Sequence, residues 1–419
     1  MKKQALILIP MAACMALTGC GQKNIKTELM EKNVINLSWW GNDSRHTYMM
    51  DGVDLFESQN PDIDVKISYG DWNGYETKTQ VYMESGNEAD VMLINYSWLG
   101  RYSPTGEGYY DLYELSDYID LSTFGEEYLQ YGIVNGKLNA LPTAMNTVIM
   151  CFNQDIFDKY GLELPTDWDD LFEAAEVMRE DGIYVMSIAK KHAVIMLYSY
   201  YEQLSGKQAF NSDGQFLLET SDIEIMLDFY KSLVDEKVMI PLGDYDRNQF
   251  TNGQAAGTAI WVSDAGNYCN ALENNGGSPV IVDYPMLENA KSQAKYIKPS
   301  TLYAISKNTE NPVAAAKLLN FLLNNQEMAL LTGTEKGVPI SSSALSALSE
   351  NDKLGSYEYE AYEKMHMDSA NMSILYPAME NDSALNAFKN GADEYLYDKM
   401  TIEEAAQLIY DNIHAVLED

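Results

Sequence analysis

The segments after residue 33 alternate between strand-like and helix-like patterns, and this order limits the possible folds more than any other feature of the chain. A strand is predicted over 34–40, a helix over 46–58, a strand over 63–67, a helix over 72–85 and a buried strand over 89–94. The apolar residues recur every second position in the strands and about every 3.6 positions in the helices. A β-α-β-α-β order builds a sheet with right-handed crossovers and with helices on its faces. The predicted fold class is therefore α/β.

The same alternation begins again in the middle of the chain. We predict strands over 148–152, 258–262 and 280–285, and helices over 156–160, 168–178, 223–234 and 314–324, with a helical C-terminal region over 382–417. With 419 residues, of which 46% are hydrophobic, the chain can bury more than one core. Two domains are the natural expectation.

The N-terminus has the parts of a secretory signal. Lys2 and Lys3 precede an apolar run over 5–17 that is too short for a usual membrane-spanning helix. The segment Leu17-Thr18-Gly19-Cys20 resembles the lipobox of bacterial lipoproteins. This resemblance implies a signal peptide over 1–19 and acyl chains such as palmitate on Cys20. We therefore expect a lipid-anchored protein on the extracellular face of the cell membrane, of the Gram-positive type rather than periplasmic, with a flexible tether over 20–33. The alternative is an ordinary signal peptide with an incidental cysteine.

The composition excludes some classes of partner and cofactor. A formal charge of −35 makes nucleic acid a poor partner, because phosphate binding depends on clustered cations. The four histidines lie far apart in the sequence and form no metal-ligand spacing, so we expect neither a metal nor a cofactor. Cys151 and Cys269 could pair in an exported protein, but free buried thiols are favoured. The 30 tyrosines suit a surface or cleft, because a tyrosine side chain can stack on a ligand and form a hydrogen bond to it at the same time.

Five short segments in a fixed order carry a resemblance that covers essentially all of the chain after the signal. They are 56–65 (FESQNPDIDV), 86–91 (GNEADV), 152–157 (FNQDIF), 250–256 (FTNGQAA) and 311–317 (NPVAAAK). In this order the chain resembles the extracellular solute-binding proteins of carbohydrate ABC importers, the maltose-binding-protein-like family 1. The resemblance implies a monomer that is not an enzyme and that binds an oligosaccharide for an ABC permease.

The resemblance also implies two discontinuous α/β lobes, joined by two or three crossing strands, with the ligand in the cleft between them. On this pattern the N-terminal lobe takes 34–142 plus 284–330. The C-terminal lobe takes 143–283 plus 331–419.

Candidate ligand-binding residues follow from two physical rules. Ligands of open α/β sheets lie beyond the C-terminal ends of strands, and a sugar needs flat aromatic surfaces together with fixed polar groups. Applied to the first lobe and then to the second, these rules and the resemblance select Trp40, Asp43, Arg45, His46, Trp72, Tyr75, Tyr96, Trp98, Asn146, Trp261, Asp264, Tyr268 and Tyr303.

Each group has a structural alternative. Trp39 or Trp40 could be core while Arg45 pairs with Asp43, Trp72 and Tyr75 could form a helix-capping cluster, and Trp261 could be core.

A surface-anchored enzyme that degrades polysaccharide is the main alternative function. It would need two positioned carboxylates, and the 63 acidic residues supply such pairs by chance. The sequence contains no G-x-S-x-G, no P-loop and no zinc-protease helix. The identity of the sugar, including whether it is acidic, stays open at this point.

Overall fold

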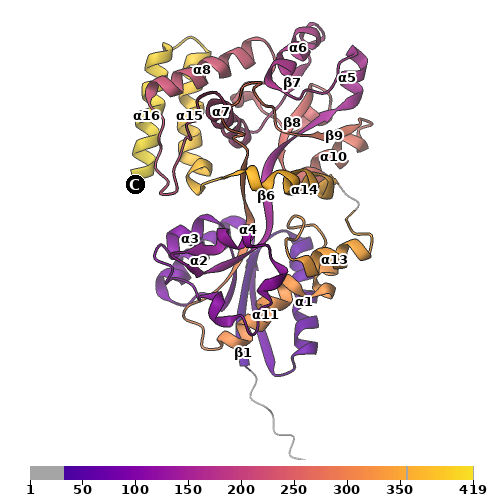
Figure 1. Cartoon of the computed structure of the whole chain (residues 1–419), viewed down its shortest axis with the longest axis vertical. Coiled ribbons are helices and arrows are strands. Elements are labelled where there is room, and N and C mark those ends of the chain that lie inside the picture. Colours follow the sequence, from indigo (N-terminus) through magenta and orange to yellow (C-terminus); the bar gives the residue numbers. More distant parts are fainter. Residues whose placement is uncertain (1–32, 355–356, 419) are drawn as a thin grey trace, which may run out of the picture.

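The computed structural model describes residues 33–354 and 357–418, and the statements below concern those residues. The predicted signal peptide, Cys20 and the tether up to residue 32 lie outside them. Figure 1 shows two bodies, one above the other, joined by a few chain segments. We call the lower one the first lobe and the upper one the second lobe.

The first lobe is a sheet covered by helices. Strand β1 (Asn33–Trp40) lies between β2 (Ile63–Gly70) and β3 (Val91–Ile94), parallel to both. Strand β10 (Tyr296–Ile305) pairs antiparallel with β3 on one side and with β6 (Ala140–Asn153) on the other. The α-helices and remaining strands of this lobe are α1 (Asp43–Gln59), α2 (Trp72–Ser85), α3 (Ser97–Tyr102), α4 (Glu126–Leu129), β4 (Ile133–Val134), β5 (Lys137–Leu138), α11 (Pro312–Asn324), α12 (Gln326–Thr332) and α13 (Ser342–Glu350).

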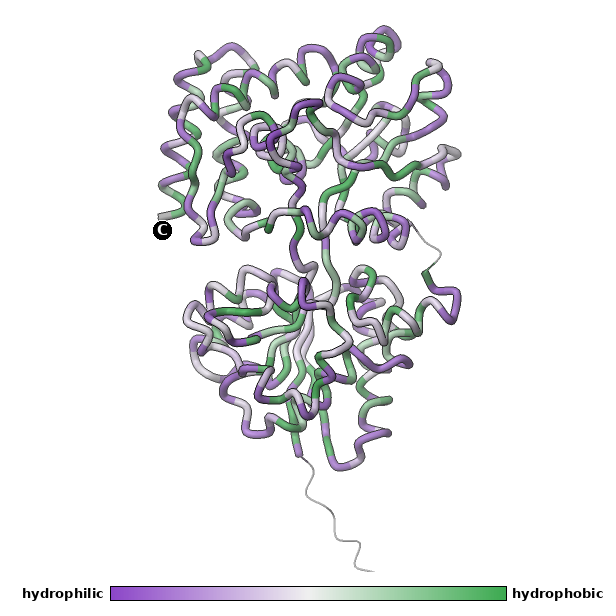
Figure 2. Tube along the Cα trace, viewed as in Figure 1, coloured by the Kyte–Doolittle hydropathy of each residue, from purple (hydrophilic) through white to green (hydrophobic). Residues whose placement is uncertain are grey.

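The second lobe has a smaller sheet and more helices. Its strands are β7 (Tyr184–Met186), β8 (Ala255–Trp261) and β9 (Pro279–Val282). Its helices are α5 (Gln154–Tyr160), α6 (Trp168–Met178), α7 (Lys190–Ser205), α8 (Thr220–Asp235), α9 (Asn248–Thr251), α10 (Ala265–Asn274), α14 (Tyr357–Asp368), α15 (Asp382–Leu396) and α16 (Ile402–Glu418). In Figure 2 the hydrophobic residues gather along the inner strands, and hydrophilic residues lie mostly on the outer helices.

Strand β6 belongs to both sheets. Its first half pairs with β10, and its second half, from Val148, pairs with β8 and β9. All 14 residues of β6 are buried, which matches its position between covering layers. Strand β10 also reaches the second lobe, where Tyr296 and Ile297 pair with β11 (Ser373–Ile374). These two strands therefore form the crossing between the lobes, as the predicted two-lobed fold requires.

Strand β10 and helix α7 are among the elements that had no counterpart in the sequence prediction. Strand β10 contains Pro299, and its ladder with β6 shifts register between Pro299 and Leu302. A proline is evidence against a strand when the sequence alone is considered, because it cannot donate a ladder hydrogen bond. Here Pro299 is tolerated because the ladder is irregular at this position. Helix α7 is buried on nearly all sides, so it lacks the periodic apolar face by which a helix is recognised.

The assignment of the residues after 330 to the two lobes also differs from the sequence prediction. Helix α13 packs against α11 and α12, so residues up to about 350 lie with the first lobe, whereas the sequence reading placed 331–419 in the second. Helix α14 packs against α10 of the second lobe, and its His366 shares a hydrogen bond with Tyr128 of α4. No helix within residues 33–354 and 357–418 is long and apolar enough to cross a membrane.

Candidate functional site

A cavity of about 480 Å³ lies between the two lobes, at the ends of the strands. Trp40 closes β1, Asn95 follows β3 and Trp261 closes β8. The cavity thus lies where the rule for α/β sheets places a ligand. Its lining consists of Trp40, Arg45, Trp72, Asn95, Asn146, Trp261, Ser263, Asp264, Asn267, Ser300, Thr301, Glu335 and Lys336.

Two tryptophans provide the aromatic surface of the first lobe. The rings of Trp40 and Trp72 meet edge to face, with centroids 4.9 Å apart. Tyr75 and Trp98 stack on each other behind them, with centroids 6.0 Å apart and planes 8° from parallel. Both are buried, and Tyr75 donates a hydrogen bond to the Leu93 carbonyl. Tyr75 and Trp98 therefore support the two half-buried rings of Trp40 and Trp72 and do not line the cavity.

Arg45 is positioned by the start of helix α1. The Asn42 side chain accepts a hydrogen bond from the Arg45 backbone N–H and begins the helix at Asp43, three residues earlier than predicted. The Arg45 guanidinium binds Glu335 through Nε at 2.9 Å and Nη2 at 3.0 Å, and its Nη1 donates to the Trp40 carbonyl. Burial alone would raise the pKa of Glu335, but the hydrogen bonds from Arg45 lower the pKa below its usual value.

Lys336 lies next to Glu335 in the loop after α12. Its ammonium donates to the Tyr303 hydroxyl at 2.7 Å and contacts Met49 Sδ at 3.6 Å. Burial, reinforced by the charge of Arg45, lowers the pKa of Lys336 to about 7. Gly337, with a φ of +96°, lets this loop approach β6, where its missing Cβ would lie 3.0 Å from that of Ala144.

The second lobe contributes the turn that follows β8. The Asn146 side chain of β6 donates to Ser263 Oγ at 2.9 Å and accepts from the Ser263 backbone N–H. The Asp264 carboxylate accepts from Asn267 and lies 3.7 Å from Arg247. Trp261 is flanked by Lys298, whose Nζ lies 4.7 Å from the ring centroid, and by the edge of His192. Lys298 in turn is paired with Glu380 at 2.5 Å.

Six of the thirteen residues predicted from the sequence line this cavity: Trp40, Arg45, Trp72, Asn146, Trp261 and Asp264. The other seven lie elsewhere. Asp43 is exposed in the first turn of α1, and His46 accepts from Trp39 Nε1 and packs against Tyr69. Tyr96 packs against Tyr131, and Tyr268 is hydrogen-bonded to Tyr245. Tyr303 is buried beneath Lys336, and Tyr75 and Trp98 lie behind the tryptophan pair.

Several lining residues were absent from that prediction. Ser300 and Thr301 lie on the unpredicted strand β10, and Asn267 lies in α10. Glu335 and Lys336 lie in the loop that follows α12. The pairing of Arg45 with Glu335 joins residues 290 positions apart and has no local sequence signal.

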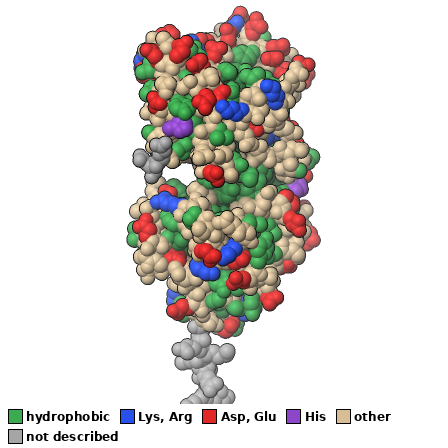
Figure 3. Space-filling model, turned by 60° about the vertical axis from the view of Figure 1, so that its left-hand side comes forward, with side chains coloured by type: hydrophobic (Ala, Val, Ile, Leu, Met, Phe, Trp, Pro, Cys, Tyr) green, Lys and Arg blue, Asp and Glu red, His purple; other side chains and the backbone are tan. Residues whose placement is uncertain are grey.

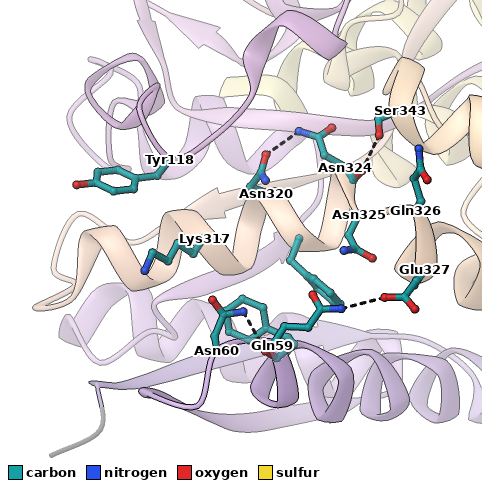
Figure 4. A pocket seen from close by; sticks show the side chains of 12 residues that line it. Gln59, Asn60, Tyr118, Lys317, Asn320, Asn324, Asn325, Gln326, Glu327 and Ser343 are labelled. Atoms are coloured by element: carbon teal, nitrogen blue, oxygen red, sulfur yellow. Dashed lines mark hydrogen bonds between the residues drawn. The ribbon is translucent and has the colours of Figure 1, made fainter. Parts of the chain in front are cut away.

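A larger hollow, of about 670 Å³, lies away from the cleft between α1, α11 and α12 (Figure 4). Several of the polar groups that line it form hydrogen bonds with one another. Gln59 donates to Glu327, Asn324 donates to Asn320, and Ser343 donates to the Asn324 carbonyl. These bonds join the ends of neighbouring helices, so the interlobe cavity is the better candidate for a functional site. Among the described residues no group of His, Cys, Asp and Glu side chains is arranged to hold a metal ion.

Two α/β lobes joined by crossing strands, with a cavity lined from both, define the two-lobed fold of periplasmic binding proteins. A family model described as bacterial extracellular solute-binding protein matches residues 42–329, and the chain belongs to this family.

Solved structures and a curated relative agree with this assignment. A periplasmic oligogalacturonide-binding protein from Yersinia enterocolitica, solved with saturated digalacturonic acid, is 28% identical, with a TM-score of 0.80 over 92% of this chain and 99% of that one. A periplasmic solute-binding protein from Pectobacterium atrosepticum is 27% identical, with a TM-score of 0.85 over 92% and 99%. A maltooligosaccharide ABC transporter solute-binding lipoprotein of Streptococcus pneumoniae is 22% identical over 84% of both chains.

Proposed function

We propose that this protein binds an extracellular oligosaccharide in the interlobe cavity and delivers it to an ABC permease in the membrane. The observation that carries the proposal is the placement of tryptophans on both sides of one cavity. Trp40 and Trp72 come from the first lobe, and Trp261 comes from the second. A sugar ring has an apolar C–H face that such rings cover, and closure of the lobes would bury it between them.

The polar groups of the cavity suit the rim of a sugar. Carboxamides and hydroxyls from Asn95, Asn267, Ser300 and Thr301 can each donate and accept hydrogen bonds. Since all but Asn267 are half-buried, their bonds to a ligand would form in a partly water-excluded space. The volume of about 480 Å³ has room for more than one ring.

The names of the relatives support the same class of ligand. Those of the Yersinia and Streptococcus proteins refer to oligosaccharides of different chemistry. The Streptococcus name also includes an ABC transporter and a lipoprotein. We extend both attributes to this chain as part of the proposal, with Cys20 as the site of the lipid and with a monomer as the working unit.

Isothermal titration of the purified protein with xylo-, manno-, malto-, fructo- and pectin-derived oligosaccharides tests the binding. We expect one of these sugars to bind with a stoichiometry of about one per chain and to be recovered at its original length. Trp261→Ala should weaken this binding about tenfold to hundredfold, because losing a buried aromatic contact costs about 1.5–3 kcal/mol. Tyr397→Ala is the matched control, since Tyr397 is an exposed aromatic residue of the second lobe outside the cavity.

Two results would contradict the proposal. Shortening of the sugar during incubation would favour the surface-anchored enzyme. Binding of monosaccharides or amino acids alone would reject the oligosaccharide as ligand.

A further inference from the structure

The wall of the cavity contributed by the first lobe contains a buried group of charges with one cation too many. Arg45, Glu335 and Lys336 all line the cavity, and their side chains lie close together. Glu335 is fully engaged, because it accepts from Arg45 Nε and Nη2 and from the Tyr48 hydroxyl. The single carboxylate is therefore committed to Arg45.

Lys336 has only neutral partners. Its ammonium donates to the Tyr303 hydroxyl and contacts Met49 Sδ, and it lies 4.8 Å and 5.7 Å from the ring centroids of Tyr303 and Tyr48. Among the described residues no carboxylate lies within ion-pair distance of this amine. The charged groups nearest to it are Arg45, which repels it, and Glu335, which attracts it. Lys336 is 9% exposed, so water offers little compensation.

The other cations that border the cavity differ from Lys336 in this respect. Lys298 is paired with Glu380, and Arg247 lies 3.7 Å from Asp264. The excess is also unusual for this chain, which carries 63 acidic residues against 28 basic ones and shows acidic side chains on both lobes in Figure 3. An isolated buried cation is costly, and proteins usually pair it. A further carboxylate bound here would balance the charges, with Glu335 and the added carboxylate facing Arg45 and Lys336.

Arg45 also has hydrogen-bonding capacity to spare on the cavity side. A guanidinium has five N–H groups, and its bonds to Glu335 and to the Trp40 carbonyl involve only one N–H on each of the three nitrogens. Since Arg45 lines the cavity, its remaining N–H groups can meet an oxyanion there.

We propose that the sugar carries a carboxylate, as in an oligomer of a hexuronic acid, and that this carboxylate binds beside Arg45 and Lys336. The inference rests on the proposed function and specifies its class of ligand. In the free protein burial and the charge of Arg45 lower the pKa of Lys336 to about 7, so its amine loses its proton near neutral pH. A bound carboxylate would favour the protonated amine and raise that pKa.

A pair of ligands that differ only in charge tests this inference on the unmodified protein. Calorimetric titration would compare tri-galacturonate with its full methyl ester, which has nearly the same shape and no charge. We expect the acid to bind at least about tenfold more tightly at pH 6, the scale of one charge-assisted hydrogen bond. Affinity for the acid should fall as the pH rises from 6 to 8.5, because free Lys336 loses its proton near pH 7. Affinity for the ester should not change over this range.

Substitution of the lysine locates the effect. Lys336→Met removes the charge and keeps the length of the side chain, so the preference for the acid and its pH dependence should both decrease. Lys317→Met, at the hollow of Figure 4, is the matched control and should leave both unchanged.

The outcomes separate the two proposals. Equal or tighter binding of the ester, or binding of neutral oligosaccharides alone, would overturn the acidic ligand and leave the proposed function intact. Preference for the acid with no change in Lys336→Met would remove Lys336 from the inference. Binding of no oligosaccharide of either kind would reject the proposed function itself.

Discussion

Arg45 connects the interlobe cavity with the stability of the first lobe. Its side chain is 14% exposed and that of Glu335 is 24% exposed, so their ion pair is largely screened from water. The pair joins the first turn of α1 to the loop that carries Lys336. Breaking a pair of this kind leaves the other charge without compensation, which is costly in a partly buried place.

We predict that Arg45→Met lowers the free energy of unfolding by about 1.5–3 kcal/mol at pH 7, the scale of a hydrogen bond to a charged group. The pKa of Glu335 is lowered in the folded protein. The ionised Glu335 carboxylate therefore contributes fully to the free energy of unfolding above the pKa that Glu335 has in the unfolded chain. This contribution is lost as the pH falls through the lower pKa that Glu335 has in the folded protein. The penalty of Arg45→Met should shrink between about pH 7 and about pH 3.5. Urea unfolding of both proteins at the two pH values measures it.

The double variant Arg45→Met/Glu335→Gln controls for the many other carboxylates of the chain. It should be more stable than Arg45→Met alone at pH 7, because the Glu335 carboxylate no longer stands without the guanidinium that binds it. A penalty of equal size at both pH values would show that packing of the Arg45 stem, and not the ion pair, determines the stability.

At the scale of elements, local sequence patterns were reliable where a segment has one buried face or one clear cap. The helix predicted over 72–85 coincides with α2, which Asp71 begins as N-cap and Gly86 ends in the left-handed conformation. Strand β10 was missed because Pro299 and the polar Lys298, Ser300 and Thr301 interrupt its pattern. Those polar residues face the cavity or its border, so an element that the sequence patterns missed is part of the candidate site.

The packing of α10 on β6 gives a prediction about the two cysteines. Cys151 of β6 and Cys269 of α10 are buried free thiols with their Sγ atoms 3.5 Å apart. The contact with Cys151 and burial together raise the pKa of the Cys269 thiol. A protonated, buried thiol reacts slowly. We therefore expect neither cysteine to be alkylated in the native protein and both to be alkylated after unfolding without reductant.

Peptide mapping by mass spectrometry measures the modification at each cysteine separately, so that Cys20 does not interfere. A disulfide-linked peptide pair containing Cys151 and Cys269 would contradict the expectation of free thiols.

At the scale of the whole molecule, the two-lobed fold could be expected from the order of the segments and the resemblance they carry. The position of the cavity followed from the ends of β1, β3 and β8. Which side chains enter it depends on contacts between distant segments, such as Arg45 with Glu335 or Asn146 with Ser263. A pattern within one segment does not contain that information. It also cannot tell Trp40, which lines the cavity, from Trp98, which supports it.

The whole molecule also includes its place at the membrane, which depends on Cys20 outside the described residues. If a lipid on Cys20 and the tether over 20–33 hold the protein near its permease, the anchor increases the effective concentration without any new contact at the cavity. Cys20→Ala should then leave the affinity of the purified protein for its oligosaccharide unchanged and reduce uptake by cells. Titration calorimetry measures the first quantity, and accumulation of the labelled sugar measures the second. Loss of affinity in Cys20→Ala would contradict this division of roles, and unchanged uptake would show that delivery does not need the anchor.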